Sequence, residues 1–176
     1  MKVIVLYASR YGSTKEIAEF IAETFRRQGV AADARSVGAA PRLDDYDAVV
    51  IGSAVYMGHW MGDAVEFVRQ NRAALADRPV WLFSSGPLQL GQEVTSTEDP
   101  GLEPKEIGEF REAIHPRDHR VFFGALDPAK LGFSHRLIRK LPAGRDLLPE
   151  GDFRNWDDIE AWTGGILRAL AVPAES

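Results

Sequence analysis

Residues 3–14 run Val3-Ile4-Val5-Leu6-Tyr7-Ala8-Ser9-Arg10-Tyr11-Gly12-Ser13-Thr14, an apolar stretch that ends in a turn rich in hydroxyl groups. The apolar stretch predicts a buried strand, and the helical spacing of Ile17, Ile21 and Phe25 predicts that a helix follows the turn. Gly12 lets the backbone of the turn come close to a ligand. Because the first amides of a helix are free and favour negative charge, this strand, turn and helix predict a phosphate-binding loop.

The composition limits what kind of protein this is. The 176 residues are 45% hydrophobic and 10% aromatic, enough to fill the core of one domain. The net charge of -5 lacks the basic excess typical of nucleic-acid binders, so no nucleic acid is expected as a partner. The chain has no cysteine, which excludes disulfides, thiolate metal sites and thiol nucleophiles. We therefore expect no metal site, and any redox chemistry must come from a bound cofactor.

The N-terminus and the hydropathy pattern bear on localisation. The chain begins with a strand pattern rather than a basic and apolar leader, and no apolar run approaches the roughly 18 residues of a membrane span. These features predict a cytoplasmic protein.

Apolar runs alternate with helix-period segments along the chain, which predicts a single domain over residues 1–176. Ser13 and Glu16 fit a capping box at the start of the first helix, and Gln28-Gly29 fits its end. The predicted strands are 3–8, 30–37, 47–52, 80–84 and 121–125, and later helices are predicted over about 61–75, from Pro104 to about 114, and over about 156–170. This order predicts an α/β fold: a three-layer α/β/α, doubly wound five-stranded parallel sheet, order 2-1-3-4-5. Such a sheet binds its ligand at its carboxyl edge, between strands one and three.

The second loop at that edge is Ser53-Ala54-Val55-Tyr56-Met57-Gly58-His59-Trp60. Tyr56 can stack on a planar ring, and Gly58 lets a neighbouring peptide rotate against such a ring. Trp60 either stacks as well or packs under the following helix. His59 is the one candidate catalytic residue, as a proton donor, and its alternative role is that of an ordinary loop histidine.

The third loop follows the strand that ends at Ser84 and contains Ser85, Gly86, Leu88 and Gln89. Its amides, hydroxyls and glutamine can bind the carbonyl and imide groups of a ring. The polar stretch 93–103 beyond it is predicted to be a surface segment. Three tryptophans are predicted to lie in the core: Trp81, Trp156 and Trp162.

An inserted segment at about 126–149 is longer than a strand-to-helix connection needs. Apolar residues at helical spacing alternate there with basic ones, which predicts a short basic amphipathic helix. Such a helix can meet an anionic substrate, a partner or, through 130–141, a membrane surface at its periphery; alternatively it packs on the end of the sheet.

The loops and the order of elements resemble the flavodoxin family over essentially the whole chain. A narrower resemblance is to the flavodoxin-like, quinone-dependent protoporphyrinogen oxidase group of haem synthesis, and it rests on Gly58-His59-Trp60, the inserted segment and the run Asp152-Phe153-Arg154-Asn155-Trp156-Asp157. The resemblance implies FMN as the cofactor. It places the FMN phosphate at Ser9, Arg10, Tyr11, Gly12, Ser13 and Thr14, and the flavin ring at Ser53, Ala54, Val55, Tyr56, Met57, Gly58, Ser85, Gly86, Leu88 and Gln89.

The resemblance implies an oxidoreductase that moves electrons or hydride between an organic substrate and a quinone or redox partner, in the cytoplasm or at the inner face of the membrane. A plain electron-transfer flavodoxin is the first alternative, which the basic insert disfavours because such carriers dock through acidic faces. A cofactor-free binding domain of the same fold is the second. A receiver-type signalling domain has the same strand order, but it needs acidic residues after strand one and an aspartate after strand three. This chain has Ser9 and Gly52-Ser53 at those places, which disfavours that class of protein.

Overall fold

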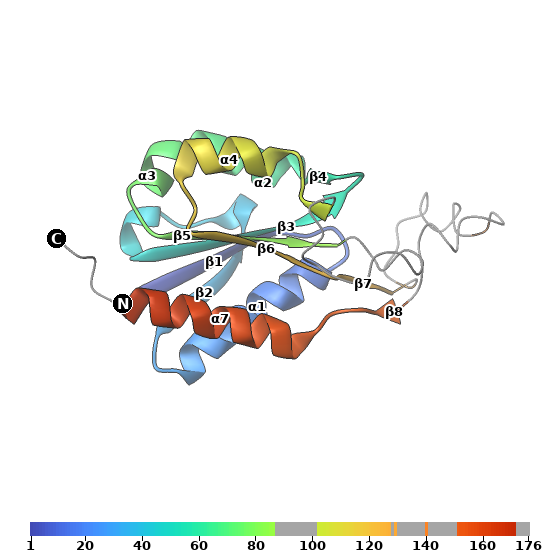
Figure 1. The fold of residues 1–176 in the computed structure, drawn as a ribbon, viewed down its shortest axis with the longest axis horizontal. Coiled ribbons are helices and arrows are strands. Elements are labelled where there is room, and N and C mark those ends of the chain that lie inside the picture. The colour runs from blue at the N-terminus through green and yellow to red at the C-terminus, as the bar shows by residue number, and fades with distance from the viewer. Residues whose placement is uncertain (87–101, 128, 130–139, 141–150, 172–176) are drawn as a thin grey trace.

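The computed structural model describes residues 1–86, 102–127, 129, 140 and 151–171 (Figure 1). Its parallel strands are β1 (Lys2–Ala8), β2 (Ala31–Ser36), β3 (Ala48–Tyr56), β5 (Val80–Ser85) and β6 (Asp118–Phe122). They lie side by side in the order β2-β1-β3-β5-β6, which is the predicted order 2-1-3-4-5 of the parallel strands along the chain. The sheet also contains β4 (His59–Trp60), a short antiparallel partner of β3 that the sequence did not predict.

Helices cover both faces of the sheet, which confirms the three-layer architecture. In Figure 1, α1 (Ser13–Arg27) and α7 (Trp156–Ala171) lie on one face. The opposite face carries α2 (Gly62–Gln70), α3 (Arg72–Ala76) and α4 (Glu106–Ile114). Two short 3-10 turns, η1 (Val37–Ala39) and η2 (Leu43–Asp45), connect β2 to β3. None of the helices among the described residues is long and apolar enough to cross a bilayer.

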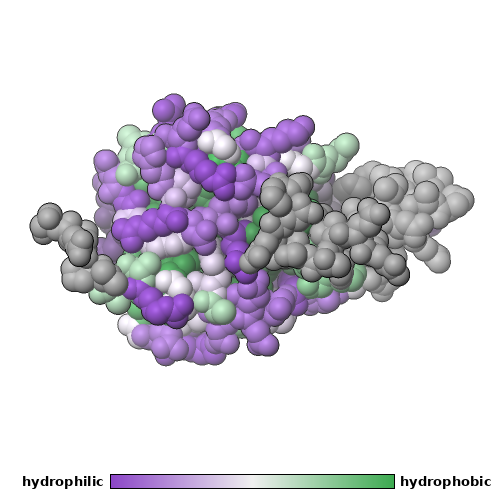
Figure 2. Space-filling view, in the orientation of Figure 1, coloured by the Kyte–Doolittle hydropathy of each residue, from purple (hydrophilic) through white to green (hydrophobic). Residues whose placement is uncertain are grey.

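The core forms two apolar layers, one on each side of the sheet. Along β1, Val3 and Val5 face the layer under α1 and α7, whereas Ile4 and Leu6 face the layer under α2 to α4. Both sides of the central strands are therefore buried, which explains why their sequences are continuous apolar runs rather than alternating patterns. Hydrophilic residues cover much of the outer surface of the helices in the view of Figure 2.

The tryptophans divide between the interior and its margin. Trp81 lies in the core, as predicted. Trp156 and Trp162 pack against the core under α1 and α7 but are only partly buried, so the prediction for these two is confirmed only in part. Their rings lie against Phe20 and Phe122, with centroid distances of 4.9 and 5.5 Å. An indole that keeps its N–H near the surface can find a polar partner there, as Trp162 does by donating to Asp118 Oδ2 at 2.7 Å.

Several element boundaries differ from the predictions. The predicted helix 61–75 is divided at Asn71, whose side-chain amide donates to the Phe67 carbonyl at 2.8 Å. The predicted strand 121–125 lies earlier, as β6, because the polar residues from Asp118 onward pair in register with β5. Helix α4 starts two residues after Pro104. The end of α1 is confirmed: Gly29 follows it with a left-handed φ of 81°.

The predicted capping box at the start of α1 is wrong. Gly12 is the N-cap residue, and no side chain caps the helix. Glu16 instead accepts a hydrogen bond from Arg154 Nη1 at 2.6 Å, which ties the start of α1 to the segment before α7. The Glu16 carboxylate, which the sequence pattern predicted to cap the helix, therefore forms a long-range ion pair with Arg154 instead.

Two short strands, β7 (Ala125–Leu126) and β8 (Gly151–Asp152), form an antiparallel ribbon. The Phe153 amide donates to the Gly124 carbonyl at 3.1 Å and extends this pairing. The ribbon therefore brings together the two ends of the inserted segment. The predicted amphipathic helix of that segment lies outside the described residues.

Candidate functional site

The register of the sheet places the three predicted loops at one edge. Ala8 of β1 pairs with Ser53 of β3, and Ser53 pairs with Ser84 of β5. Gly86 continues this edge with a left-handed φ of 96°, and its amide donates to the Phe122 carbonyl at 2.9 Å. The carboxyl ends of β1, β3 and β5 thus open on the same side, where Figure 1 also shows β4, β7 and β8. Of the predicted third-loop residues, Ser85 and Gly86 lie there, and Leu88 and Gln89 are outside the described residues.

The loop after β1 wraps around the start of α1. Gly12 has a φ of 95°, a left-handed conformation that favours glycine. Its amide donates to Ser9 Oγ at 3.0 Å, which closes the turn. The Glu16 amide donates to the Gly12 carbonyl at 3.0 Å, so the helix amides before it have no intrahelical acceptor. Thr14, at the first turn of the helix, is 1% exposed. This arrangement leaves a set of backbone donors at the positive end of a helix, which suits an anion.

The same loop is tied to the β7–β8 ribbon. Ser13 Oγ accepts a hydrogen bond from the Ala125 amide at 3.0 Å, so its own hydroxyl hydrogen remains a donor. Arg154 makes a paired contact with Asp152, at 2.8 Å from Nε and 2.6 Å from Nη2, besides its bond to Glu16. These hydrogen bonds raise the pKa of Arg154, with the Asp152 contact the largest cause and burial acting against it. The ribbon and the predicted phosphate loop therefore form one connected unit.

Residues 53–60 form a β-hairpin rather than a loop. Tyr56 pairs with His59, and Val55 pairs with Trp60. The two turn residues, Met57 and Gly58, have φ values of 51° and 78°, which is the left-handed pair that a tight two-residue hairpin turn requires. Gly58 adopts this backbone conformation readily, but the conformation is rare for a residue that carries a side chain, such as Met57. Met57 lies at the tip and is 98% exposed.

Tyr56 connects the hairpin to the predicted phosphate loop. The Arg10 guanidinium carbon lies 5.1 Å from the centre of the Tyr56 ring. Burial raises the pKa of the Tyr56 hydroxyl, and the nearby Arg10 charge acts in the opposite direction. In this structure Arg10 therefore lies over an aromatic ring, and its predicted role at the FMN phosphate stays a prediction.

Trp60 packs inside the protein against helix α4, which confirms the predicted packing role rather than the stacking role. It is 4% exposed, and its ring meets Phe110 edge-on at a centroid distance of 5.3 Å. Its indole N–H donates to Ser84 Oγ at 2.8 Å. Ser53 also serves the interior: it is fully buried, its hydroxyl lies 2.8 Å from the Ala54 carbonyl, and it accepts from the Met61 amide at 2.9 Å. The Ser53 hydroxyl thus connects the two chain segments that flank the hairpin, at Ala54 and at Met61.

His59, the candidate catalytic residue, has a carboxylate partner. Its Nδ1 lies 2.6 Å from Glu106 Oε1, and its side chain is 49% exposed. Orientation of a histidine by a carboxylate is a common arrangement in proton-transfer sites. The sequence did not reveal this partner, because Glu106 lies 47 residues further along the chain.

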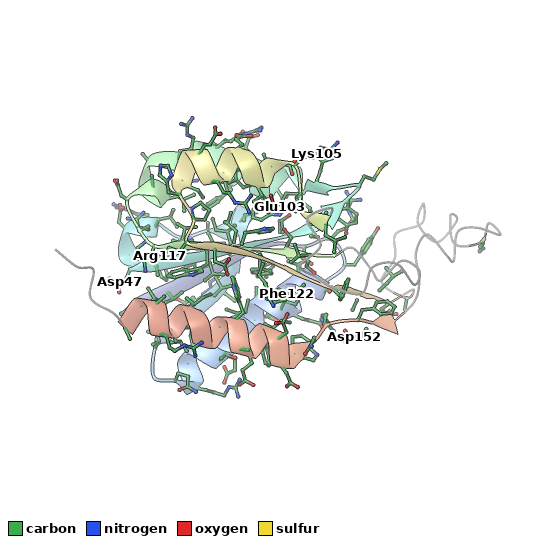
Figure 3. All side chains as sticks on the ribbon, in the orientation of Figure 1. Asp47, Glu103, Lys105, Arg117, Phe122 and Asp152 are labelled. Carbon is green, nitrogen blue, oxygen red and sulfur yellow. The ribbon has the colours of Figure 1, made fainter. Side chains whose placement is uncertain are left out.

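A chain of polar side chains that begins at the Trp60 partner Ser84 was also missed. Ser84 Oγ lies 2.8 Å from His119 Nε2, and His119 Nδ1 lies 3.6 Å from Glu103 Oε2. Because Ser84 accepts from the Trp60 indole, its own hydrogen can go to His119. The His119 side chain is 3% exposed, and burial lowers its pKa to about 4. His119 is therefore neutral at pH 7. Figure 3 shows Glu103 near the start of α4, over the sheet.

Comparisons with known proteins agree with this fold. Two of the similar proteins are the protoporphyrinogen IX dehydrogenases [quinone] of Escherichia coli strain K12 and Escherichia coli O157:H7, each 34% identical over 180 aligned positions that cover 98% of both chains. The fold is similar to that of a flavodoxin from the domain Archaea, with a TM-score of 0.61, 17% identity and coverage of 98% of this chain and 100% of that one. It is also similar to flavodoxin 2 from Bacillus cereus, with a TM-score of 0.62, 15% identity and coverage of 96% and 99%.

The family match covers most of the chain. The model of the Flavodoxin domain family matches residues 4–143, which include the predicted phosphate loop, the hairpin and Ser85-Gly86. Membership in this family implies a flavin as the cofactor. The chain belongs to the flavodoxin domain family.

Proposed function

We propose that this protein is an FMN-dependent oxidoreductase that passes electrons from a porphyrinogen to a quinone. The observation that carries the proposal is the joint position of two features at one sheet edge. The start of α1 offers backbone donors for a phosphate, and Tyr56 offers an aromatic ring beside them, linked through Arg10. The substrate and the acceptor are inferred from the name of the 34% identical relatives, protoporphyrinogen IX dehydrogenase [quinone].

The residues present fit FMN. Ser9, Gly12, Ser13 and Thr14 would hold the phosphate, and the hairpin of residues 55–60 with Ser85-Gly86 would flank the ring. Bound FMN would supply the electron and hydride transfer, so no side chain need act as a nucleophile. His59 would hold or move a proton at Nε2 while Glu106 orients the ring through Nδ1. Peripheral membrane contact through 130–141 stays a prediction.

Replacing Thr14 with alanine should weaken FMN binding about tenfold, because the loss of one hydrogen bond to a charged phosphate is worth about 1.4 kcal/mol or more. Fluorescence titration of the apoprotein with FMN measures this dissociation constant. Thr24→Ala is the matched control, since Thr24 is equally buried in the same helix but contacts Arg27 instead of the loop. Equal FMN affinity in the unmodified protein and Thr14→Ala would count against the phosphate loop.

The proposed function is tested by loading the protein with FMN, reducing the flavin with light in the absence of oxygen, and adding a soluble quinone. We expect the flavin absorbance to bleach and then to return with the quinone. A protein that binds FMN but returns electrons only to another redox protein would be a plain electron carrier. A protein that binds no flavin would be a cofactor-free binding domain.

A further inference from the structure

The start of α4 contacts the hairpin at consecutive positions. The Lys105 amide donates to the Gly58 carbonyl at 3.1 Å. Glu106 then uses both carboxylate oxygens: Oε2 accepts from the Trp60 amide at 3.1 Å, and Oε1 lies 2.6 Å from His59 Nδ1. Figure 3 shows Lys105 at the end of α4 that lies over β4. One helix start therefore contacts the turn glycine and both residues of β4.

Glu106 is suited to this role by its surroundings. Its side chain is only 13% exposed, so its two hydrogen bonds face little competition from water. Burial acts to raise the pKa of this carboxyl, but hydrogen bonds from His59 and from the Trp60 amide outweigh it, and the net pKa lies below the usual value. The carboxylate also lies at the N-terminus of α4, where the helix dipole favours negative charge. It is therefore ionised at neutral pH and has a hydrogen-bond partner at each oxygen.

The hairpin needs such support at its turn. Met57 holds a left-handed conformation that costs free energy for a residue with a side chain, and its side chain is too exposed for packing to compensate. The base of the hairpin is held separately, by the burial of Trp60 and its bond to Ser84. Besides the pairing of His59 with Tyr56, the contacts from Lys105 and Glu106 hold Gly58 and His59 among the described residues. Gly58 and His59 follow Met57 directly in the chain.

We propose that Glu106 is a positioning residue that fixes the Tyr56–Trp60 hairpin against the flavin, and that it thereby sets the affinity and the midpoint potential of bound FMN. This inference rests on the proposed function, because it assumes that the hairpin flanks FMN. Glu106 acts through the hairpin backbone and His59 rather than by contact with the cofactor. Its effect must therefore be visible in the hairpin even before FMN binds.

The experiment compares Glu106→Ala, Glu106→Gln and Glu109→Ala with the unmodified protein. In the apoprotein, amide hydrogen exchange at Trp60 should become on the order of tenfold faster in Glu106→Ala, which loses the acceptor. The same variant should bind FMN more weakly and show a shifted midpoint potential. Glu106→Gln keeps an acceptor for Trp60 and should restore most of each property. Glu109→Ala is the control, because Glu109 lies on the same helix but pairs with Arg69 at 2.7 Å.

Urea denaturation of each variant separates these local effects from a loss of overall stability. Unchanged exchange at Trp60 in a folded Glu106→Ala would overturn the inference. So would faster exchange with an unchanged FMN affinity and potential, since Glu106 would then only stabilise the hairpin. If the unmodified protein bound no FMN, the proposed function itself would fail, and that failure is distinct because the exchange comparison in the apoprotein needs no flavin.

Discussion

Gly52→Ala is expected to destabilise the protein by about 3 kcal/mol, near the upper end for overpacking of a core. A Cβ at position 52 would lie 1.9 Å from Cζ of Phe83, the neighbouring residue on β5. Phe83 is fully buried and packs against Phe122 and Trp162, at ring distances of 6.1 and 6.3 Å. Its ring cannot move aside without disturbing those contacts. The free energy of unfolding, measured in urea, gives the size of the effect.

Two further variants test the cause. Gly38→Ala is the matched control, because a Cβ at that exposed glycine meets nothing within 4 Å and its backbone is not left-handed. Phe83→Leu removes the ring atoms that clash, so Gly52→Ala should cost far less in the Phe83→Leu background than in the unmodified protein. If the cost of Gly52→Ala were the same in both backgrounds, the ring clash would not be its cause.

The second large effect is a loss of stability on mild acidification, of about 2 kcal/mol between pH 7 and pH 5. The pKa of His119 falls from 6.5 to about 4 on folding, because burial disfavours the charged imidazole. Between these values the unfolded chain binds a proton that the folded protein does not. Stability is therefore complete above about pH 6.5 and falls as the pH drops toward 4. Urea denaturation at intervals of pH measures this slope.

His119→Gln provides the control for that slope. Glutamine does not titrate, so the stability of this variant should change much less between pH 7 and pH 5, whatever its absolute value. The pKa of several carboxyls is lowered, including that of Glu103, for which the hydrogen bond from Arg111 is the largest cause. These carboxyls lose their stabilising charge as the pH falls below their ordinary values, which are 4.5 for the glutamates and 3.8 for the aspartates. They therefore contribute little in this window. Equal slopes in the variant and the unmodified protein would show that another group is responsible.

The sequence predicted the sheet well where burial alone determines the pattern. The central strands β1, β3 and β5 are apolar on both faces, and the alternation with helices gave their order. Gly12 and Gly29 were predicted correctly as turn residues because each needs a left-handed backbone. The edge strand β6 was misplaced because its first residues are polar and are held by pairing with β5 rather than by burial of their own.

The site was predicted only in part, for two physical reasons. The hairpin was missed because Met57-Gly58 lacks the Asn-Gly or Asp-Gly signal of a tight hairpin turn, so tertiary contacts and not local preference fix the turn. The partners of His59 and Ser84 were missed because they come from α4 and β6, and side-chain hydrogen bonds between such distant segments leave no periodic pattern in a sequence. The roles assigned to the individual FMN-binding residues remain predictions.

The most direct test of the proposed function is the addition of protoporphyrinogen IX to the FMN-loaded protein without oxygen, followed by a quinone. The proposal predicts that the flavin absorbance bleaches as porphyrin fluorescence rises, and that the quinone restores the flavin and allows further turnover. Bound FMN that keeps its absorbance, with no porphyrin formed beyond a protein-free control, would contradict the proposal that this protein oxidises a porphyrinogen.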